Sequence, residues 1–249
     1  PPKKTSRIAE TVQNLQADTI VISDAFGWQN DALRKNSLPG FSHTYFQPLN
    51  DTWLEKQEGA HMRDIGVVLG TKVSHDTPQA VDLGERQGIM MTLNIGAHGL
   101  RLYGVYLNHA IEDKRIAQLR ALISHLSKDD TPTIITGDLN AQEDLKYVSN
   151  SEKLRSLFVR MGSLPFKALG HPYGNILHDL ERREALTLLR QEGFDTAATN
   201  NRPTAVYPYA RFFRVDHAFG RGVSMSNYTV HPTVGGASDH RPISCDVTI

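Results

Sequence analysis

Short apolar runs that stop abruptly at polar residues constrain the fold of this 249-residue chain more than any other feature. The segments DTIVIS (18–23) and TPTIIT (131–136) are the two clearest examples. The first is followed by an aspartate and the second by a Gly-Asp pair. Runs of this length are typical of strands buried on both faces of a sheet. We therefore expect a sheet with helices packed against it.

The remaining segments extend this pattern to an α/β fold. The segments expected to form strands are 43–48, 64–70, a hairpin of 88–95 and 100–107 around GAHG, two pieces within 205–220, and 241–249. The segments expected to form helices are 5–16, 111–127 and 178–194, the last ended by Gly193. We interpret 1–249 as one domain with strands of mixed direction, in which 145–193 forms a helical insertion.

Composition narrows the classes of protein that fit. Hydrophobic residues make up 39% of the chain and charged residues 22%, and no apolar stretch is long enough to span a membrane. The 27 basic and 27 acidic residues give no net charge, which argues against tight, non-specific binding to long nucleic acid. The single cysteine, Cys245, excludes an internal disulfide and a cysteine-based zinc site.

Polar residues gather where the predicted strands end. They are Asp24, Asp138 with Asn140, Asp216, the pair Asp239-His240, and His109 after LYGVYL. Strand ends are rigid while their tips stay accessible, so they suit reactive groups. Several carboxylates at one sheet edge would repel one another without a cation. Oxygen ligands without cysteine favour Mg²⁺ or Mn²⁺.

Each of these residues also has a plainer interpretation. Asp138 after glycine is a common turn residue, and Asp239-His240 after serine could cap a loop. A lone His109 could be a hydrogen-bonded structural histidine. Asp216 fits this interpretation less well, because strands disfavour aspartate. The joint occurrence of these residues favours a catalytic site over separate structural roles.

Three segments carry a resemblance to a known family. TGDLNA, FRVDHAF and GASDHRPISCDV resemble the signature segments of the endonuclease/exonuclease/phosphatase superfamily, which has the pancreatic-deoxyribonuclease-like fold. The resemblance covers most of the chain and is weakest over 145–193. It implies a four-layer sandwich, in which two packed mixed β-sheets are flanked by helices and the site lies at one end.

The resemblance also implies roles for the strand-end residues. Asp138 would orient or deprotonate the attacking water, and Asn140 would hold the phosphate. His240 would contact or protonate a phosphate oxygen, with Asp216 as its orienting partner. Asp239 would lie beside the metal or the leaving group.

The match is looser at two further positions. His109 corresponds to the family's strand-end histidine, although its surroundings, YLNHA, differ from the usual pattern. Asp24 takes the place of the family's principal metal ligand, which is a longer glutamate. The family's first strand, which supplies an asparagine ligand, is expected to be missing before the first helix of this sequence.

Together these residues predict a Mg²⁺-dependent phosphoesterase, with Mn²⁺ as an alternative metal, that hydrolyses a phosphodiester of nucleic acid or of a small or lipid molecule by in-line water attack. One alternative is a phosphomonoesterase for phosphoinositide-like or nucleotide substrates, and another is a binding protein with a degraded site. Arg86 and Arg214 are candidates for gripping phosphate at the rim, unless they are solvated surface charges. We expect a monomer whose partner is a phosphate ester, with nucleic acid among the candidates.

Overall fold

The computed structural model describes most of the chain. The described residues are 2–25, 38–51, 55–56, 64–126, 129–142, 182–196, 202–205, 214–233 and 235–249. Most of 145–193 and part of 205–220 therefore lie outside the described residues, and the helical insertion and the single-domain boundary stay predictions.

The described strands form three sheets. The first has the order β1 (Thr19–Ala25), β3 (Gly66–Thr71), β2 (His43–Pro48). The second pairs β10 (Ile243–Thr248) with β9 (Ser224–Val230). The third has the order β4 (Gln79–Asp82), β5 (Gln87–Ile95), β6 (His98–Tyr106), β7 (Thr133–Asp138), β8 (Asp216–Arg221). All described pairings are antiparallel except that of β6 with β7.

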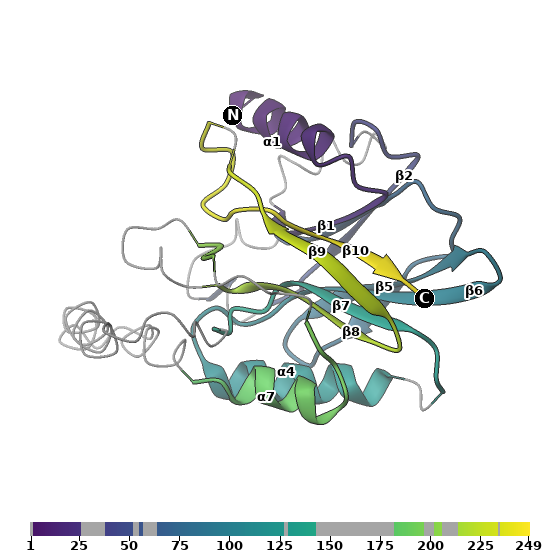
Figure 1. Ribbon diagram of the computed structural model, residues 1–249. Coiled ribbons are helices and arrows are strands. Elements are labelled where there is room, and N and C mark those ends of the chain that lie inside the picture. Colours follow the sequence, from purple (N-terminus) through teal and green to yellow (C-terminus); the bar gives the residue numbers. More distant parts are fainter. Residues whose placement is uncertain are drawn as a thin grey trace.

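Figure 1 shows the layers of the predicted sandwich. Helix α1 (Pro2–Leu15) covers the side of β1, β2 and β3, and helices α4 (Glu112–His125) and α7 (Glu184–Gln191) cover the five-stranded sheet from the opposite side. The four-layer α/β architecture expected from the sequence is thus confirmed. Among the described residues, no helix is both long and apolar enough to cross a membrane.

Three apolar clusters fill the spaces between these layers. One packs Leu119 of α4 and Leu189 of α7 against Val105 of the five-stranded sheet. A second lies between the two large sheets and includes Leu69 and Met91. The third joins α1 to its sheet and includes Val12 and Val68. This distribution explains why β3, with all six residues buried, reads as a continuous apolar run.

Several sequence expectations need correction. The segment 18–23 was expected to be buried on both faces, but the residues of β1 are only partly buried except Ala25. The reason is its place at one end of the described three-stranded sheet. Strands β4 and β9 were not expected, because β9 is largely polar and β4 is very short. The hairpin at 96–99 is confirmed, with Ile95 opposite His98.

Gly137 lets β7 approach β6 at the end of the parallel pair. Its φ is 136°, and a Cβ at this position would overlap the carbonyl oxygen of Val105. Any residue with a side chain would therefore push the strands apart where Asp138 follows. The glycine of the Gly-Asp pair is required by a close backbone approach inside the sheet.

Replacing Gly137 with alanine should lower the free energy of unfolding by about 2–4 kcal/mol, from overpacking and an unfavourable φ. Urea unfolding measures the loss. Gly96→Ala in the β5–β6 turn is the matched control, since Gly96 also has a positive φ of 60° but open space around it. The Gly96→Ala variant should lose only about 1 kcal/mol, from its φ alone. Equal losses in the two variants would contradict the role assigned to the close approach.

Candidate active site

Neighbouring strands bring two of the predicted carboxylates to the same sheet edge. Because β6 and β7 run parallel, Tyr106 and Asp138 are register partners at their carboxyl ends. Strand β8 runs the other way and pairs its first residue, Asp216, with Asp138. The register alone therefore places the carboxylates of positions 138 and 216 side by side.

Hydrogen bonds fix the corner that contains Asp138 and Asn140. The Asn140 backbone N–H donates to Asp138 Oδ1 over 2.9 Å, and Asn140 Nδ2 donates to the Leu107 carbonyl over 3.1 Å. Asn140 has a positive φ of 48°, a conformation that asparagine tolerates better than most residues. Both side chains are largely buried, at 5% and 8% exposure.

Ser23 of β1 connects the first sheet to this corner. Its Oγ donates to the Val105 carbonyl over 3.0 Å and accepts the Asp138 backbone N–H over 3.1 Å. The pairing of β1 with β3 is interrupted between Ile22 and Ala25, and Asp24 there has a φ of 57°. Bulges of this kind redirect side chains near active sites. No sequence motif marked Ser23, and it was missed.

His240 approaches the two carboxylates from the C-terminal segment. Its Nδ1 lies 2.9 Å from Asp216 Oδ2 and 4.0 Å from Asp138 Oδ2. Buried Thr204 holds both sides of this contact. Its Oγ1 accepts the N–H of Asp216 over 3.2 Å, and its carbonyl accepts the N–H of Arg241 over 2.7 Å. No sequence signal distinguished Thr204 from an ordinary loop residue.

The cluster has unusual proton affinities. Burial alone would lower the pKa of His240, but the charge and hydrogen bond of Asp216, together with the charges of Asp138 and Asp239, raise it to about 10. Burial and then the charge of Asp216 raise the pKa of Asp138 to about 7. His240 is therefore a cation at neutral pH, and Asp138 exchanges its proton near neutrality.

The group has the donors that a divalent cation needs. Ligand atoms of Asp138, Asp216 and His240 all lie within 4.8 Å of one another. Nδ1 of His240 is engaged by Asp216 Oδ2 over 2.9 Å, and the carboxylate oxygens of the group are hard donors of the kind that suit Mg²⁺ or Mn²⁺. The charge of Asp24 also raises the pKa of Asp138, so Asp24 acts electrostatically on the same cluster.

The other predicted site residues take different places. Asp239 is exposed beside His240. His109 is partly buried and lies two residues beyond Leu107, and it is not among the three clustered ligand residues. The prediction that Arg86 and Arg214 lie at a rim is wrong. Both are only 1% exposed, and each guanidinium packs on a tyrosine ring, Tyr106 and Tyr228 respectively.

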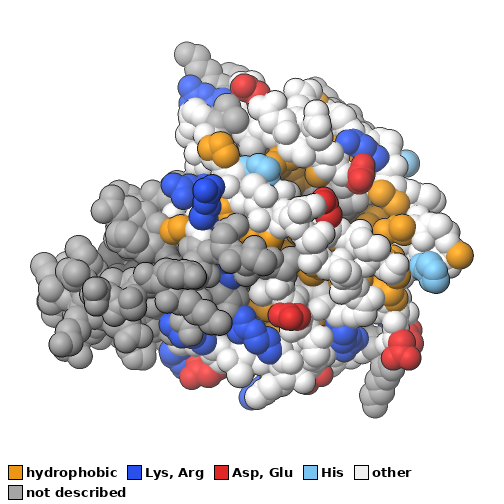
Figure 2. All heavy atoms as spheres, viewed as in Figure 1, with side chains coloured by type: hydrophobic (Ala, Val, Ile, Leu, Met, Phe, Trp, Pro, Cys, Tyr) orange, Lys and Arg blue, Asp and Glu red, His pale blue; other side chains and the backbone are white. Residues whose placement is uncertain are grey.

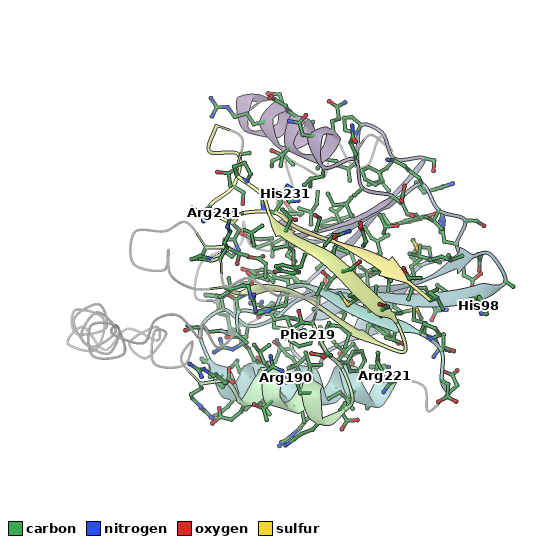
Figure 3. All side chains as sticks on the ribbon, viewed as in Figure 1. His98, Arg190, Phe219, Arg221, His231 and Arg241 are labelled. Carbon is green, nitrogen blue, oxygen red and sulfur yellow. The ribbon has the colours of Figure 1, made fainter. Side chains whose placement is uncertain are left out.

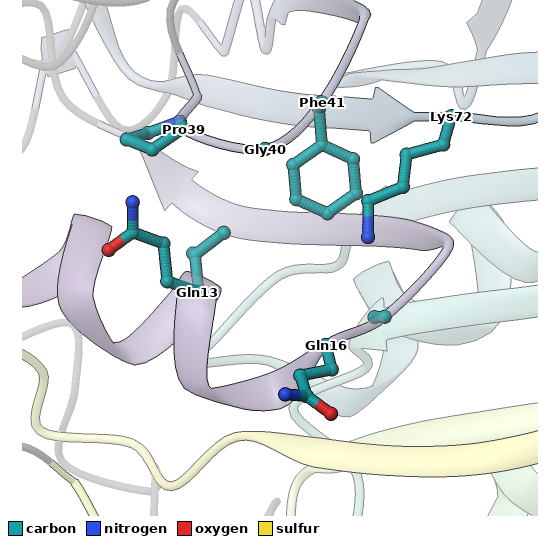
Figure 4. A pocket seen from close by; sticks show the side chains of 8 residues that line it. Gln13, Gln16, Pro39, Gly40, Phe41 and Lys72 are labelled. Carbon is teal, nitrogen blue, oxygen red and sulfur yellow. The ribbon is translucent and has the colours of Figure 1, made fainter.

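The described residues also form a cavity and a face of mixed charge. A cavity of about 350 Å³ between α1 and the 39–41 segment is lined by Gln13, Gln16, Phe41 and Lys72, and it contains none of the clustered residues (Figure 4). On the face drawn in Figure 2, basic and acidic side chains are interspersed. Arg241, next to His240, lies at the opposite end of the molecule from His98 (Figure 3).

Together these observations define an α/β protein of packed sheets with a group that could hold a metal ion at one sheet edge. The sequence matches the model of the Endonuclease/Exonuclease/phosphatase family over residues 1–240, and the chain belongs to that family. No curated protein matches the chain.

Several solved structures share the fold at low identity. The human nocturnin catalytic domain with bound sulfate is 13% identical, with a TM-score of 0.66, and the match covers 100% of this chain and 86% of that one. A mannosyl-6-phosphatase of Bacteroides thetaiotaomicron is 13% identical, with a TM-score of 0.59 and coverage of 100% and 91%. Truncated TDP2 of Caenorhabditis elegans is 12% identical, with a TM-score of 0.57 and coverage of 98% and 89%.

Replacing Asp216 with asparagine should lower the pKa of His240 by about 1–3 units, because it removes the nearest opposite charge. An NMR titration of the His240 ring in chelator measures this. Since the raised pKa stabilises the fold fully below the unfolded value of 6.5, the stability difference between the variants should be largest near pH 6 and vanish above about pH 10. A His240 titration unchanged by the substitution would contradict the pairing.

Replacing Asp138 with asparagine should raise the free energy of unfolding at pH 8 by about 1–3 kcal/mol in chelator. The folded pKa near 7 exceeds the ordinary value of 3.8, so ionised Asp138 destabilises the fold above pH 7. At pH 4 the native carboxyl is protonated and the gain should be small. Urea unfolding at both pH values measures the difference. A gain that does not depend on pH would refute the assigned electrostatic cause.

Proposed function

We propose that the chain is a metal-dependent phosphoesterase that hydrolyses a phosphodiester by in-line attack of water. The observation that carries this proposal is the position of His240 between two carboxylates. Its Nδ1 contacts Asp216 and lies 4.0 Å from Asp138 Oδ2, and the pKa is raised to about 10 for His240 and about 7 for Asp138. With these pKa values, His240 can act as a cation that binds phosphate, and Asp138 can act as a base that accepts a proton from water.

The chain's own residues divide the work of hydrolysis. Asp138 orients the water and accepts its proton, which a pKa near 7 permits at neutral pH. His240 donates a hydrogen bond to a phosphate oxygen, and Asp216 keeps its ring oriented and charged. Asn140 presents its carboxamide to the phosphate. In the family's pattern, His109 would stand beside these groups.

Asp24 and Asp239, beside the cluster, are the residues proposed to hold the cation. When bound, a Mg²⁺ or Mn²⁺ ion would neutralise phosphate oxygens and lower the cost of the charge that develops in the transition state. The negative charges of Asp216 and Asp24 repel that of Asp138, and a bound cation would relieve this repulsion, which supports the assignment.

A phosphomonoesterase is the second candidate. The absence of net charge and the mixed charges on the face shown in Figure 2 favour a small phosphate ester over long nucleic acid. The similarity in fold to a mannosyl-6-phosphatase, at 13% identity, supports a monoester as the second candidate. The proposal therefore ranks small diesters and monoesters ahead of duplex DNA.

A substrate panel tests these assignments. The protein is incubated with Mg²⁺, Mn²⁺ or chelator and offered bis-nitrophenyl phosphate, nitrophenyl phosphate, sugar and nucleotide monophosphates, and plasmid DNA. We expect metal-dependent turnover of a phosphate ester and a loss of about a hundredfold or more in kcat for His240→Ala. Exposed His98→Ala, at the distant β5–β6 turn, should retain the native rate.

Each outcome of the panel has a defined meaning. Turnover of monoesters alone would replace the diester proposal with the second candidate. Metal binding and binding of phosphate esters without turnover would identify a binding protein with a degraded site. Turnover that persists in chelator or in His240→Ala would overturn the proposed mechanism.

A further inference from the structure

A buried guanidinium donates to the backbone at the end of β6, next to the Asp138 corner. Arg86, in the turn between β4 and β5, is 1% exposed. Its Nε donates to Asp51 Oδ2 over 2.6 Å. Its Nη1 donates to the carbonyls of Leu107 over 2.6 Å and Tyr106 over 3.2 Å, and its guanidinium lies 4.8 Å from the Tyr106 ring centroid.

Leu107 connects this guanidinium to the candidate active site. Its carbonyl accepts from Arg86 Nη1 and also from Asn140 Nδ2, so both lone pairs of one oxygen are used. Its N–H donates to the Asp138 carbonyl over 3.0 Å. Leu107, which follows β6, is thus hydrogen-bonded to Arg86 and also to the two site residues Asn140 and Asp138.

The orientation of the Asn140 carboxamide depends on that carbonyl. A carboxamide has nearly the same shape after a 180° flip, so only its hydrogen bonds decide which end carries the oxygen and which the nitrogen. The Leu107 carbonyl can accept a hydrogen bond from Nδ2 of Asn140 but not from Oδ1. This bond therefore sets the orientation of the whole carboxamide, including Oδ1 and the second N–H. A displaced Leu107 carbonyl would remove this control, and a misplacement of about 1 Å is enough to cost up to a hundredfold in rate.

We propose that Arg86 is a positioning residue, which fixes the Leu107 carbonyl and through it the carboxamide of Asn140. The inference rests on the proposed function for its catalytic consequence, while the geometric part stands without it. Stability alone is a weak reason for this arrangement, since replacing a buried ion pair with apolar residues is often neutral or stabilising. An apolar side chain could fill the space but could not donate to two carbonyls at the end of β6.

Asp51 anchors the guanidinium in this position. It is 7% exposed and follows β2, so the three-stranded sheet contributes to the placement of Arg86 in the β4–β5 turn of the five-stranded sheet. Its contact with Nε leaves Nη1 aimed at the end of β6. Lysine at position 86 would keep the charge but lacks the planar fork that contacts a carboxylate and carbonyls together.

The first test follows the Asn140 side-chain amide by NMR in metal-free protein, with the signal assigned by its loss in Asn140→Ala. Arg86→Lys should shift or broaden the signal. The matched control is Arg115→Lys. Arg115 forms a second buried ion pair, with Glu112, and its guanidinium also donates to a backbone carbonyl, that of Asn108. It should leave the Asn140 signal in place. An unchanged signal in folded Arg86→Lys would overturn the proposal.

The second test is a double-mutant cycle on the substrate that the panel identifies. Arg86→Lys should lower kcat about ten- to a hundredfold with a smaller change in KM, and Arg86→Lys combined with Asn140→Ala should be no slower than Asn140→Ala alone. If the two substitutions lower kcat independently, so that their effects multiply in the double variant, Arg86 acts by another route and the proposal is wrong.

Two provisions keep the tests decisive. If Arg86→Lys does not fold, Asp51→Asn loosens the same guanidinium while keeping a hydrogen-bonding side chain, and it should shift the same amide signal. If no substrate is turned over, the proposed function fails while the NMR comparison still decides whether Arg86 positions Asn140.

Discussion

The fold depends on a backbone junction at Asp138, where two sheets and the C-terminal segment meet. The parallel pairing of β6 and β7 brings Tyr106 and Asp138 together, and the antiparallel pairing with β8 adds Asp216. Ser23 binds this junction to the first sheet through one hydroxyl group. Every candidate function of the chain rests on this junction, because it brings together Asp138, Asp216 and His240 from distant parts of the sequence.

The same junction concentrates unfavourable features that a purely structural edge would avoid. Asp24 and Asn140 both have positive φ, Gly137 allows an unusually close strand approach, and ionised Asp138 lies beside another carboxylate. Each costs free energy, and the surrounding cores offset that cost. Strain and like charge at one edge of a well-packed sandwich are typical of a site kept for its chemistry.

The sequence predicted the clustered residues well because the strands carry their own signals. Apolar runs followed by aspartate indicated where β1 and β7 end, whereas Asp216, expected at the end of a strand, begins β8. The resemblance in three segments supplied the order of the site. Arg86 and Arg214 were misassigned, because a sequence does not show whether an arginine is solvated or paired in the interior. Ser23 and Thr204 were missed, because a single hydroxyl that bridges two segments leaves no local pattern.

By itself, the sequence determined the class of fold, the family and the identity of the residues at the sheet edge, since these follow from local hydrophobic patterns and short motifs. Only the tertiary structure decided how those residues act on one another. The pairing of His240 with Asp216, the raised pKa of Asp138 and the link from Arg86 through Leu107 to Asn140 all depend on distances between segments far apart in the chain. Electrostatic interactions and hydrogen bonds depend on such distances, and no local pattern in the sequence encodes them.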